Sequence, residues 1–435
     1  MSTQTQAVRS LKQVNAMPAP TWSWLKMNSA GLAIPEGLKA ASKNQISLSI
    51  LEGSERVLSG NADAFDDALV RANKRFSARS RSSAPGDATE RKLLAEGALD
   101  AMDVPALSRY QQGALEVQEE LSVGAAFLTG MGHEAYSYLR GVAKSPHVID
   151  IATDSVASLA LNIGGALGSA AVASVDVVVR RGAHLKLKVL MDSPGSAHVA
   201  ADAPSPVVGL AMRVYVGEDA CFELDNTQAL SDAYLALDDM GLFMDTRAKV
   251  QVRHTVLGAG AAYTGLAADV RGDNAKIEVT TSYLGMRRQL RDFNYQLRHL
   301  GQRTESHMQA NGVLAGTSSK VLRGTIDLMH GCKGSAGSEQ ETVLLVDEGV
   351  DNKTVPVILC DEDDVQGNHG ATIGHVRPEQ LFYLACRGFS PEAAEALFVG
   401  AKFEEAYLQA SDDATRAAVI ELAQEIIPSF EEDMA

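Results

Sequence analysis

Apolar and polar residues alternate along the middle of the chain, in short runs that span residues 148–373. In one run, Leu185, Leu187 and Val189 occupy every second position, and Gly, Asp and Asn residues separate it from its neighbours. This period of two predicts half-buried β-strands joined by turns. Because no helix-length pattern separates the strands, apart from an ambiguous patch at residues 286–300, an alternating βαβ architecture is excluded.

Many short strands of this kind can build a sandwich, a barrel or a solenoid. Aromatic residues make up only 5% of the chain, whereas Ala, Val and Gly are abundant. Small and branched residues suit a solenoid, because each coil buries one face of its strands against the next coil. At roughly 20–25 residues per coil, the region would hold roughly nine to eleven coils. The pattern alone favours neither the solenoid nor the sandwich.

Helical periodicity precedes this β-region. Phe65, Leu69, Ala72 and Phe76 recur at three- to four-residue spacing, which predicts an amphipathic helix. Two further helices are expected between residues 93 and 128, again from apolar spacing. The N-terminal part of the chain is therefore predicted to be an arm followed by helices.

Helix punctuation follows the β-region. Pro378 suits a first helical position, where its missing N–H costs nothing, and Gly388 ends that helix. Ser390 is a hydroxyl N-cap, so a second helix is expected over 391–409, with a third over 414–427. The predicted regions are an N-terminal arm and helical region (1–145), a β-helix core (146–375) and a C-terminal helical domain (376–435).

The net charge limits the partners that the chain can bind. It is −16 at pH 7, with 39 basic and 55 acidic residues. A nucleic-acid groove needs clustered Lys and Arg to displace counterions, and an anionic membrane surface attracts basic residues. We therefore expect neither nucleic acid nor a membrane as a partner.

Cysteine usage and the N-terminal sequence indicate the compartment. The four cysteines are scattered and form no CxxC pair, which is typical of a reduced cytosolic protein. The first twenty residues contain no apolar core of a signal peptide. Glycines and Asp176 interrupt the most apolar stretch, residues 156–179, so it is a poor transmembrane candidate. These features predict a cytoplasmic protein.

The end of the β-region resembles the C-terminal signature of the SufB/SufD family, the scaffold-type subunits of the SUF iron–sulfur cluster assembly machinery. The resemblance rests on HGATIG at 369–374, followed by RPEQLFYLACRGFSPEAAEALFVGAKFEEAY at 377–407. The stretch that leads into this motif, LLVDEGVDNKTVPVILCDEDDVQGNHGA, is more similar to SufD-like and minimal-system members than to SufB.

The resemblance implies a mainly β fold, in which a right-handed parallel β-helix (solenoid) is flanked by N-terminal and C-terminal α-helical regions. It also implies a scaffold subunit that is not an enzyme. A SufC-type ABC ATPase would dock on the C-terminal helices, and a SufB-type subunit or a second copy of the chain would pair through the β-helix. A transient iron–sulfur cluster would form at the subunit interface.

No nucleotide is expected on this chain itself. Gly331, Gly334 and Gly337 form no GxxxxGK[ST] motif and are better explained as solenoid turns. An isolated His133–Glu134 pair lacks a second His at helical spacing, so we interpret it as a solvent-exposed turn and not as a metalloprotease site. The ATPase activity is therefore expected to come from the partner.

Candidate metal ligands gather at the end of the β-region. Cys360 ends an apolar run, an acidic turn reaches Asp364, and His369 follows between glycines. Because iron accepts thiolate, imidazole and carboxylate ligands, His369, Cys360 and Asp364 are candidates for cluster assembly. The alternative is a solvated turn beside a small core cysteine. An EF-hand is excluded because Val365 stands where a ligand is needed.

The match to the family pattern is incomplete at this site. His369 corresponds to the SufD-like histidine at the SufB–SufD interface, but Gly367 stands where many SufD sequences carry a cysteine. Gly370 stands where SufB carries an acidic residue, and the chain has no cysteine between Cys332 and Cys360. A cluster held by this chain alone in the SufB manner is therefore not expected.

Three alternatives to the SufD-like role stay open. The chain could be the single B-type scaffold of a minimal SUF-like system that works as a homodimer, with Cys360 and Cys332 as substitute ligands. It could be a β-helical carbohydrate-active enzyme, which would need paired carboxylates in a groove. It could also be a purely structural interaction protein.

Overall fold

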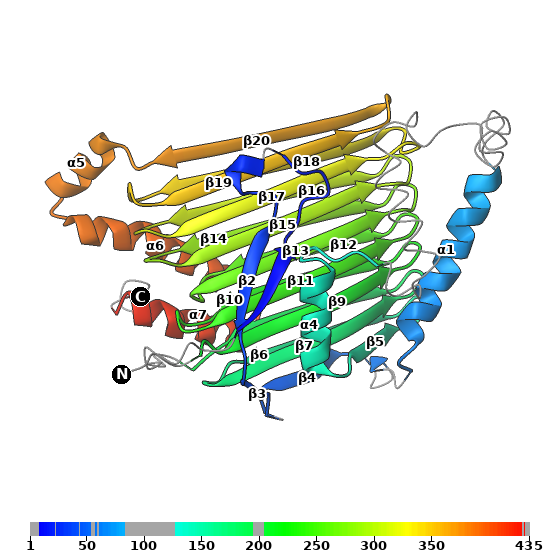
Figure 1. Ribbon diagram of the computed structural model, residues 1–435, viewed down its shortest axis with the longest axis horizontal. Coiled ribbons are helices and arrows are strands. Elements are labelled where there is room, and N and C mark those ends of the chain that lie inside the picture. Colours follow the sequence, from blue (N-terminus) through cyan, green and yellow to red (C-terminus); the bar gives the residue numbers. More distant parts are fainter. Residues whose placement is uncertain are drawn as a thin grey trace.

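The computed structural model describes residues 8–21, 23–42, 44–53, 57–58, 61–82, 127–194, 204–428 and 430. Its body is a parallel β-solenoid of about eight turns. Strands that follow one another in the chain lie on opposite sheets, and every second strand pairs within one sheet (Figure 1). The helices predicted between residues 93 and 128 lie outside the described residues.

The solenoid strands form two facing sheets. One has the order β20-β18-β16-β14-β12-β10-β8-β6-β4, and the other has the order β19-β17-β15-β13-β11-β9-β7-β3, with β5 paired to β7. All of these pairs are parallel except β4 with β6. The strands are β3 (Lys39–Ala40), β4 (Ile46–Glu52), β5 (His147–Ile151), β6 (Val156–Gly164), β7 (Ser169–Val179), β8 (His184–Asp192), β9 (Val207–Val216), β10 (Cys221–Ala229), β11 (Leu235–Met244), β12 (Lys249–Val256), β13 (Ala261–Val270), β14 (Lys276–Gly285), β15 (Leu290–His299), β16 (Glu305–Leu314), β17 (Ser319–Leu328), β18 (Ser335–Leu345), β19 (Asp351–Cys360) and β20 (Val365–His375).

The expected number of coils, nine to eleven, is wrong because each coil is longer than the assumed 20–25 residues. Lys249 pairs with Lys276, and Lys276 pairs with Glu305, so successive coils begin 27 and 29 residues apart. Each coil holds two strands of about ten residues and two turns. The ambiguous patch at residues 286–300 supplies one such strand, β15.

Stacked corners hold successive coils in register. Asp219, Arg247, Asn274 and Arg303 each adopt a positive φ between 53° and 59° at the same corner of successive coils. The N–H of each donates to a carbonyl of the next coil; the Asn274 N–H, for example, lies 2.9 Å from the Gln302 oxygen. The corner thus continues the hydrogen-bond ladder of the sheets around the turn. Gly334 occupies this position in a later coil with a φ of 72°, which confirms that it is a turn glycine.

N-terminal elements cover the sheet that contains β7 and β9. They are β1 (Val8–Val14), η1 (Ser23–Leu25), β2 (Ala30–Pro35), α1 (Ala64–Ser82) and α4 (His133–Ala143). The β1–β2 hairpin lies across this sheet in Figure 1. Its anchor is Asn15, whose side-chain amide donates to Asp292 on β15. The interpretation of His133–Glu134 as a turn is wrong, because these residues begin α4 and Glu134 accepts a hydrogen bond from the Lys12 N–H at 2.8 Å.

Three helices follow β20: α5 (Pro378–Cys386), α6 (Pro391–Gln409) and α7 (Asp413–Ile426). As predicted, the Ser390 hydroxyl caps α6 and accepts from the Ala393 N–H. Helix α6 contacts β14 and β16, and α7 contacts β10. Within the described residues, no helix is long and apolar enough to cross a bilayer.

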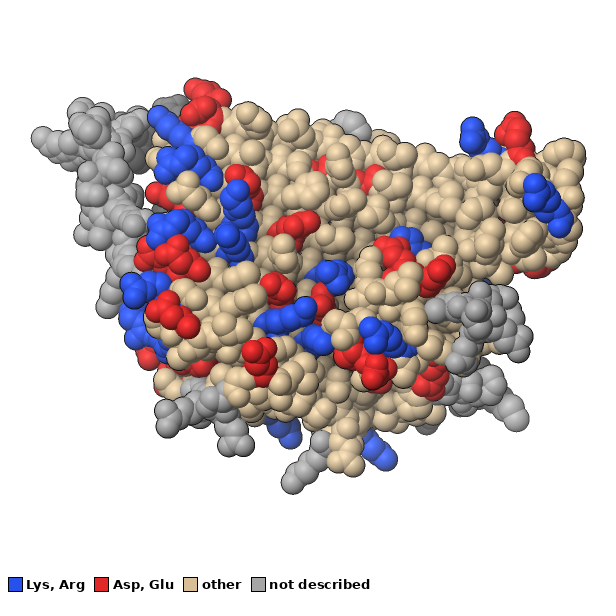
Figure 2. Space-filling model, turned by 180° about the vertical axis from the view of Figure 1, so that it is seen from behind, with Lys and Arg blue, Asp and Glu red and all other residues tan. Residues whose placement is uncertain are grey.

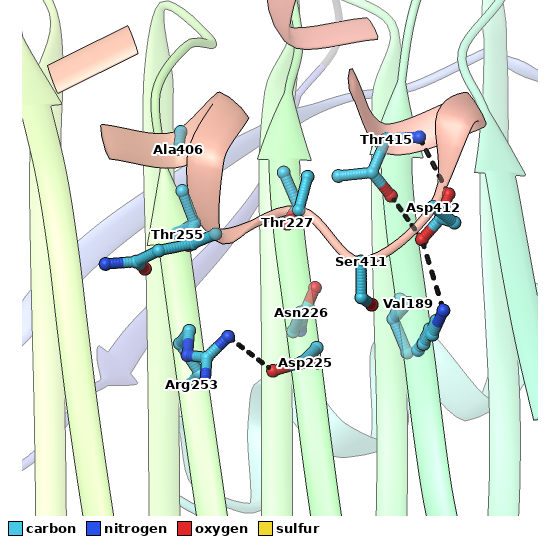
Figure 3. Close-up of a pocket in the computed structure, with 13 residues that line it drawn as sticks. Val189, Asp225, Asn226, Thr227, Arg253, Thr255, Ala406, Ser411, Asp412 and Thr415 are labelled. Atoms are coloured by element: carbon cyan, nitrogen blue, oxygen red, sulfur yellow. Dashed lines mark hydrogen bonds and ion pairs between the residues drawn. The ribbon is translucent and has the colours of Figure 1, made fainter. Parts of the chain in front are cut away.

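Polar contacts fix α7 to the sheet beneath it (Figure 3). Asp412 caps α7 by accepting from the Thr415 N–H at 2.9 Å, and its carboxylate lies 3.7 Å from Lys188 Nζ on β8. Arg253 and Asp225 form an ion pair at 3.1 Å on the neighbouring strands. Helices α6 and α7 are therefore held on the outer face of the solenoid.

Candidate functional site

The last coil leaves the solenoid open. Strands β19 and β20 are the terminal strands of the two sheets, and within the described residues no strand pairs with their outer edges. Nearly every residue of β20 is exposed, whereas residues at the matching positions of β18 alternate between buried and accessible. Unpaired edges invite pairing with another chain, so this end is a candidate interface.

His369 faces the interior of the solenoid at this open end. It pairs in register with Glu339 on β18, and paired residues of parallel strands point to the same side of a sheet. Glu339 is buried. The residues at this position in successive coils, from β6 to β20, are Leu159, Leu187, Leu224, Val252, Val279, Met308, Glu339 and His369. The column is thus apolar until the last two coils.

Cys360 also ends an inward-facing column. It pairs with Leu328, which in turn pairs with the buried His299. The Cys360 thiol is exposed and donates to the Glu362 carbonyl at 3.3 Å. Cys332, the other candidate thiol, is buried, and this burial raises its pKa to about 11. Of these two candidate thiols, Cys360 is therefore the accessible one.

Asp364 lies in the turn between β19 and β20. Its carbonyl accepts from the Gly334 N–H at 2.6 Å, which is the last of the hydrogen bonds that join the stacked corners of successive coils. Its side chain is exposed. The adjacent Glu362 accepts from the Gly331 N–H at 2.9 Å, and this hydrogen bond lowers the pKa of Glu362.

The structure places the three candidates on one end of the solenoid without joining them into one ligand set. His369 is the fifth residue of β20, whereas Cys360 lies before its first residue. A Cβ added at Gly367 would lie 3.0 Å from Ile358, so these two residues face each other between Cys360 and His369. Within the described residues, no hydrogen bond or ion pair links His369 to Cys360 or Asp364.

Directly beneath His369 the interior is polar. Lys320 on β17 and Glu341 on β18 are fully buried, with 2.6 Å between Nζ and Oε1. The Tyr283 hydroxyl donates to the same carboxylate at 2.7 Å, and the Thr354 hydroxyl donates to it at 2.5 Å. Burial lowers the pKa of Lys320, while Glu341 opposes that shift. Glu341 is thus a buried carboxylate that accepts from three donors, and these interactions offset the free-energy cost of burying its charge.

Glu339 lacks such partners. Its Oε2 is buried without a hydrogen-bond partner. Its Oε1 packs against Gly324 on the facing sheet, where a Cβ atom added to the glycine would lie only 2.0 Å from this oxygen. Burial, with the charge of Glu341 added to it, raises the pKa of Glu339 to about 7. A carboxyl group with this pKa exchanges a proton near neutral pH, directly below an accessible imidazole.

The sequence analysis did not predict this buried polar group, which consists of Glu339, Glu341 and Lys320. On a strand of alternating residues, a polar side chain is ordinarily assigned to the outer face. The signal that could have found them is parity: Glu339 and Glu341 share the phase of Val343, an inward apolar residue of the same strand.

A second exposed surface lies on the helix that follows β20. Helix α5 has no buried residue, and its apolar side chains Phe382 and Tyr383 are 71% and 56% exposed. Leu381 on the same helix, Phe389 after it and Ile373 on β20 are also exposed. The helix extends away from the sheets in Figure 1. An exposed group of large apolar side chains indicates a protein-binding surface.

Charge is unevenly distributed over the sheet that carries β20. Figure 2 shows Lys, Arg, Asp and Glu side chains crowded along the edge where the coils turn, and few of them in the band nearest β20. The outward residues of β20 are uncharged: Gln366, Asn368, Gly370, Thr372 and Gly374. The outer face of β20 therefore lacks the charged side chains that commonly protect an edge strand.

Comparison with known proteins identifies relatives. Residues 162–402, more than half of the chain, match a family model described as SUF system FeS cluster assembly, SufBD core domain. The chain is 32% identical over 128 residues to the iron–sulfur cluster assembly protein SufD of Bacillus subtilis, covering 29% of each chain. It is 22% identical over 144 residues to SufD of Escherichia coli, covering 33% of this chain and 34% of that protein.

A SufBD family iron–sulfur cluster assembly protein of Mycobacterium bovis is 34% identical over 128 residues, which is 29% of this chain and 15% of that protein. The aligned regions therefore span about a third or less of the length of these relatives. The similarity includes the solenoid and its open end, because the family match extends past β20 into α6.

Proposed function

Because the chain belongs to the SufBD core family of SUF-system iron–sulfur cluster assembly proteins, we propose that it is a scaffold subunit in which the open end of the solenoid handles the cluster. In this role it would be SufD-like and would catalyse no reaction of its own. The observation that carries the proposal is the position of His369: an exposed imidazole at the unpaired end of the β-helix, above a buried carboxyl group.

The unpaired edge supports association through the β-helix. Every residue of β20 from Val365 to His375 has a backbone N–H, whereas β19 carries Pro356, which is tolerated at sheet edges and lacks a donor. β20 is therefore the better template for pairing. A SufB-type subunit is our first candidate for this partner, and a second copy of the chain is the alternative.

The separation of the candidate ligands supports a shared site. His369 and Cys360 lie apart on the same end, so neither completes a four-ligand cluster site with the other. Cluster iron is usually held by cysteine thiolates, with imidazole as an alternative ligand. A partner pairing with β20 would supply the missing ligands next to His369, and the cluster, as cargo, would form between the subunits. Cys360 and Asp364 would be secondary ligands at most.

The exposed apolar surface of α5 supports docking of an ABC-type ATPase of the SufC kind. This helix continues directly from β20 through Val376 and Arg377. Movement imposed on α5 by a nucleotide-driven partner would therefore be transmitted to the strand that carries His369. No nucleotide site on this chain is needed for this mechanism.

The proposal is tested by co-expressing the chain with the ABC-type ATPase, with and without a SufB-type chain, and purifying the complex anaerobically. Light scattering gives the mass, and iron and sulfide analyses give the cluster content. A complex that acquires iron only with the SufB-type chain supports the SufD-like role. Two copies with two ATPases that carry iron and sulfide would indicate the minimal homodimer. The absence of any ATPase binding would contradict the proposal.

Matched variants locate the docking surface. Phe382→Ser with Tyr383→Ser removes the two most exposed aromatic side chains of α5, so ATPase retention should fall strongly. Leu408→Ser is the control, because Leu408 is 69% exposed on α6. Equal loss of the ATPase in both variants would argue against α5 as the docking element.

A further inference from the structure

A cluster of three potential metal ligands lies on the outer face of the sheet, remote from the open end. It comprises His184, at the start of β8, with Cys221 and Glu223 on β10. One ligand atom from each residue lies within 4.8 Å of the other two. Four strands of the same sheet separate β10 from β20, so this cluster is distinct from the surface that carries His369.

The strand register brings these three side chains together. Cys221 pairs directly with His184 across the parallel ladder, so their side chains are neighbours on one face. Glu223 follows two positions after Cys221 and therefore points to the same face. Each of these residues is partly buried and alternates with fully buried ones, which places them on the outer face. Backbone hydrogen bonds also hold the starts of these strands, such as the Cys221 N–H to the Ala183 carbonyl at 2.8 Å.

The donor set has a definite chemical preference. Zinc-type sites combine Cys sulfur, His nitrogen and carboxylate oxygen at about 2.0–2.3 Å from the ion. Atoms that share such a tetrahedral ion lie about 3.4–3.8 Å apart, a spacing that the 4.8 Å limit permits after small side-chain rotations. Calcium and magnesium prefer oxygen ligands alone, so the thiol and imidazole select a borderline transition metal.

An ordinary ion pair explains only part of this arrangement. His184 Nε2 lies 2.8 Å from Glu223 Oε1, which accounts for two of the three residues. It does not account for a partly buried cysteine beside both. Burial and the charge of Glu223 raise the pKa of the Cys221 thiol, while Lys249 on the next strand opposes this. A bound cation would replace the thiol proton and neutralise the carboxylate.

We propose that His184, Cys221 and Glu223 bind one borderline divalent metal ion, Zn²⁺ or Fe²⁺, with an open position toward solvent. The side chains of His184 and Glu223 are 41% and 31% exposed, so an ion could enter without unfolding of the sheet. Three protein ligands and one open position characterise exchangeable or reactive sites, whereas structural zinc sites have four. The proposal does not depend on the assembly function at the open end.

The test is an anaerobic titration of the full chain with Co²⁺, whose thiolate charge-transfer band reports a cysteine ligand. We expect one Co²⁺ per chain with this band, and its displacement by Zn²⁺ or by Fe²⁺ identifies which ion the site prefers. Cys221→Ser should abolish the band, and His184→Ala should weaken binding at least about 10-fold, the lower end of what a lost outer-shell contact costs.

Cys360→Ser is the matched control, since Cys360 is an exposed thiol at the other site. This variant should keep the band. Loss of the band in Cys360→Ser with retention in Cys221→Ser would overturn the proposal, as would the absence of a thiolate band in the unmodified protein. If Cys221→Ser fails to fold, Glu223→Gln keeps the size of the side chain, and unchanged Co²⁺ affinity in that variant would equally contradict the site.

Discussion

The two ends of the solenoid have the same backbone and different interiors. At one inward position the first four residues are Leu159, Leu187, Leu224 and Val252, and at the same position the last two coils carry Glu339 and His369. The fold tolerates both because the strand ladders and stacked corners are identical in plan. The interior can therefore change from apolar packing to polar chemistry without a change of architecture.

The ends also differ in their terminal strands. At the first coil β4 pairs antiparallel with β6, and α1 packs Phe65 and Leu69 against the neighbouring sheet. At the last coil, β20 is exposed along its length and the described residues leave its outer edge unpaired. The first coil therefore ends in a seven-residue antiparallel strand beside an apolar interior, whereas the last coil ends in an eleven-residue parallel strand beside a polar interior. This difference favours the last coil as the functional end.

We call the coils near β20, whose interior is polar, the polar half, and the coils near β6 the apolar half. The largest effect on stability is expected from breaking the buried Lys320–Glu341 ion pair in the polar half. Lys320→Met leaves Glu341 buried without its cation, which should lower the free energy of unfolding by about 3–5 kcal/mol. The midpoint of urea unfolding measures this loss.

The double variant Lys320→Met/Glu341→Gln is the control for this experiment. Removing both charges should recover most of the lost stability, since replacing a whole buried pair is often neutral. If the double variant is as unstable as the single one, the Lys320–Glu341 pair is not what stabilises this coil.

The apolar half should respond by a different mechanism. Leu187 is fully buried in the core of β8, so Leu187→Ala should cost about 2–5 kcal/mol through lost transfer energy and a residual cavity. The loss should be the same at pH 5 and pH 8, because no titratable group is involved. A pH-dependent loss at this position would remove the contrast between the two halves.

The sequence predicted the strands of both halves but only one of the interiors. Alternation at Leu185, Leu187 and Val189 correctly predicted strand β8 and its buried face. The same rule fails at Glu339, because a polar residue in an alternating run is assigned to solvent. Only the register with its neighbours shows that Glu339 lies inside. The predicted coil length was wrong for a related reason. Turns without apolar residues leave no periodic signal, so the number of residues per coil was underestimated.

The candidate ligands were predictable as residues but not as an arrangement. His369 came from a short motif, and the motif says nothing of whether the side chain faces inward. Its direction follows from pairing with Glu339, a contact between residues 30 positions apart. The separation of His369 from Cys360 likewise depends on Ile358 and Gly367 facing each other, which no local pattern encodes.

Glu339 offers a sharper test of the polar half. Burial raises its pKa from 4.5 to about 7, so the folded chain binds more protons than the unfolded chain between these values. The free energy of unfolding should therefore fall as pH rises through this window, by up to about 3 kcal/mol for this group. Glu339→Gln should remove that part of the pH dependence, which urea unfolding from pH 4.5 to 8 would measure.

Glu278→Gln provides the comparison, because Glu278 is exposed on β14 of the same sheet. This variant should leave the shape of the pH profile unchanged. If the profile of Glu339→Gln also matches that of the unmodified protein, then Glu339 is ionised in the folded chain throughout this range, as a further buried charge beside Lys320 and Glu341.

The smallest effect on folding is expected at the residue with the largest proposed role. His369 is exposed on a terminal strand, so His369→Ala should change the free energy of unfolding by no more than about 0.5 kcal/mol. In the complete complex the same variant should lose most of its capacity to acquire iron and sulfide, because the imidazole is the accessible ligand next to the pairing edge.

Asn368→Ala is the neighbouring control, since its side chain lies on the outer face and its loss should leave cluster content unchanged. Normal cluster content in the His369→Ala complex would mean that the open end serves only to join subunits. The polar interior beneath it would then have to be explained by the specificity of coil packing alone.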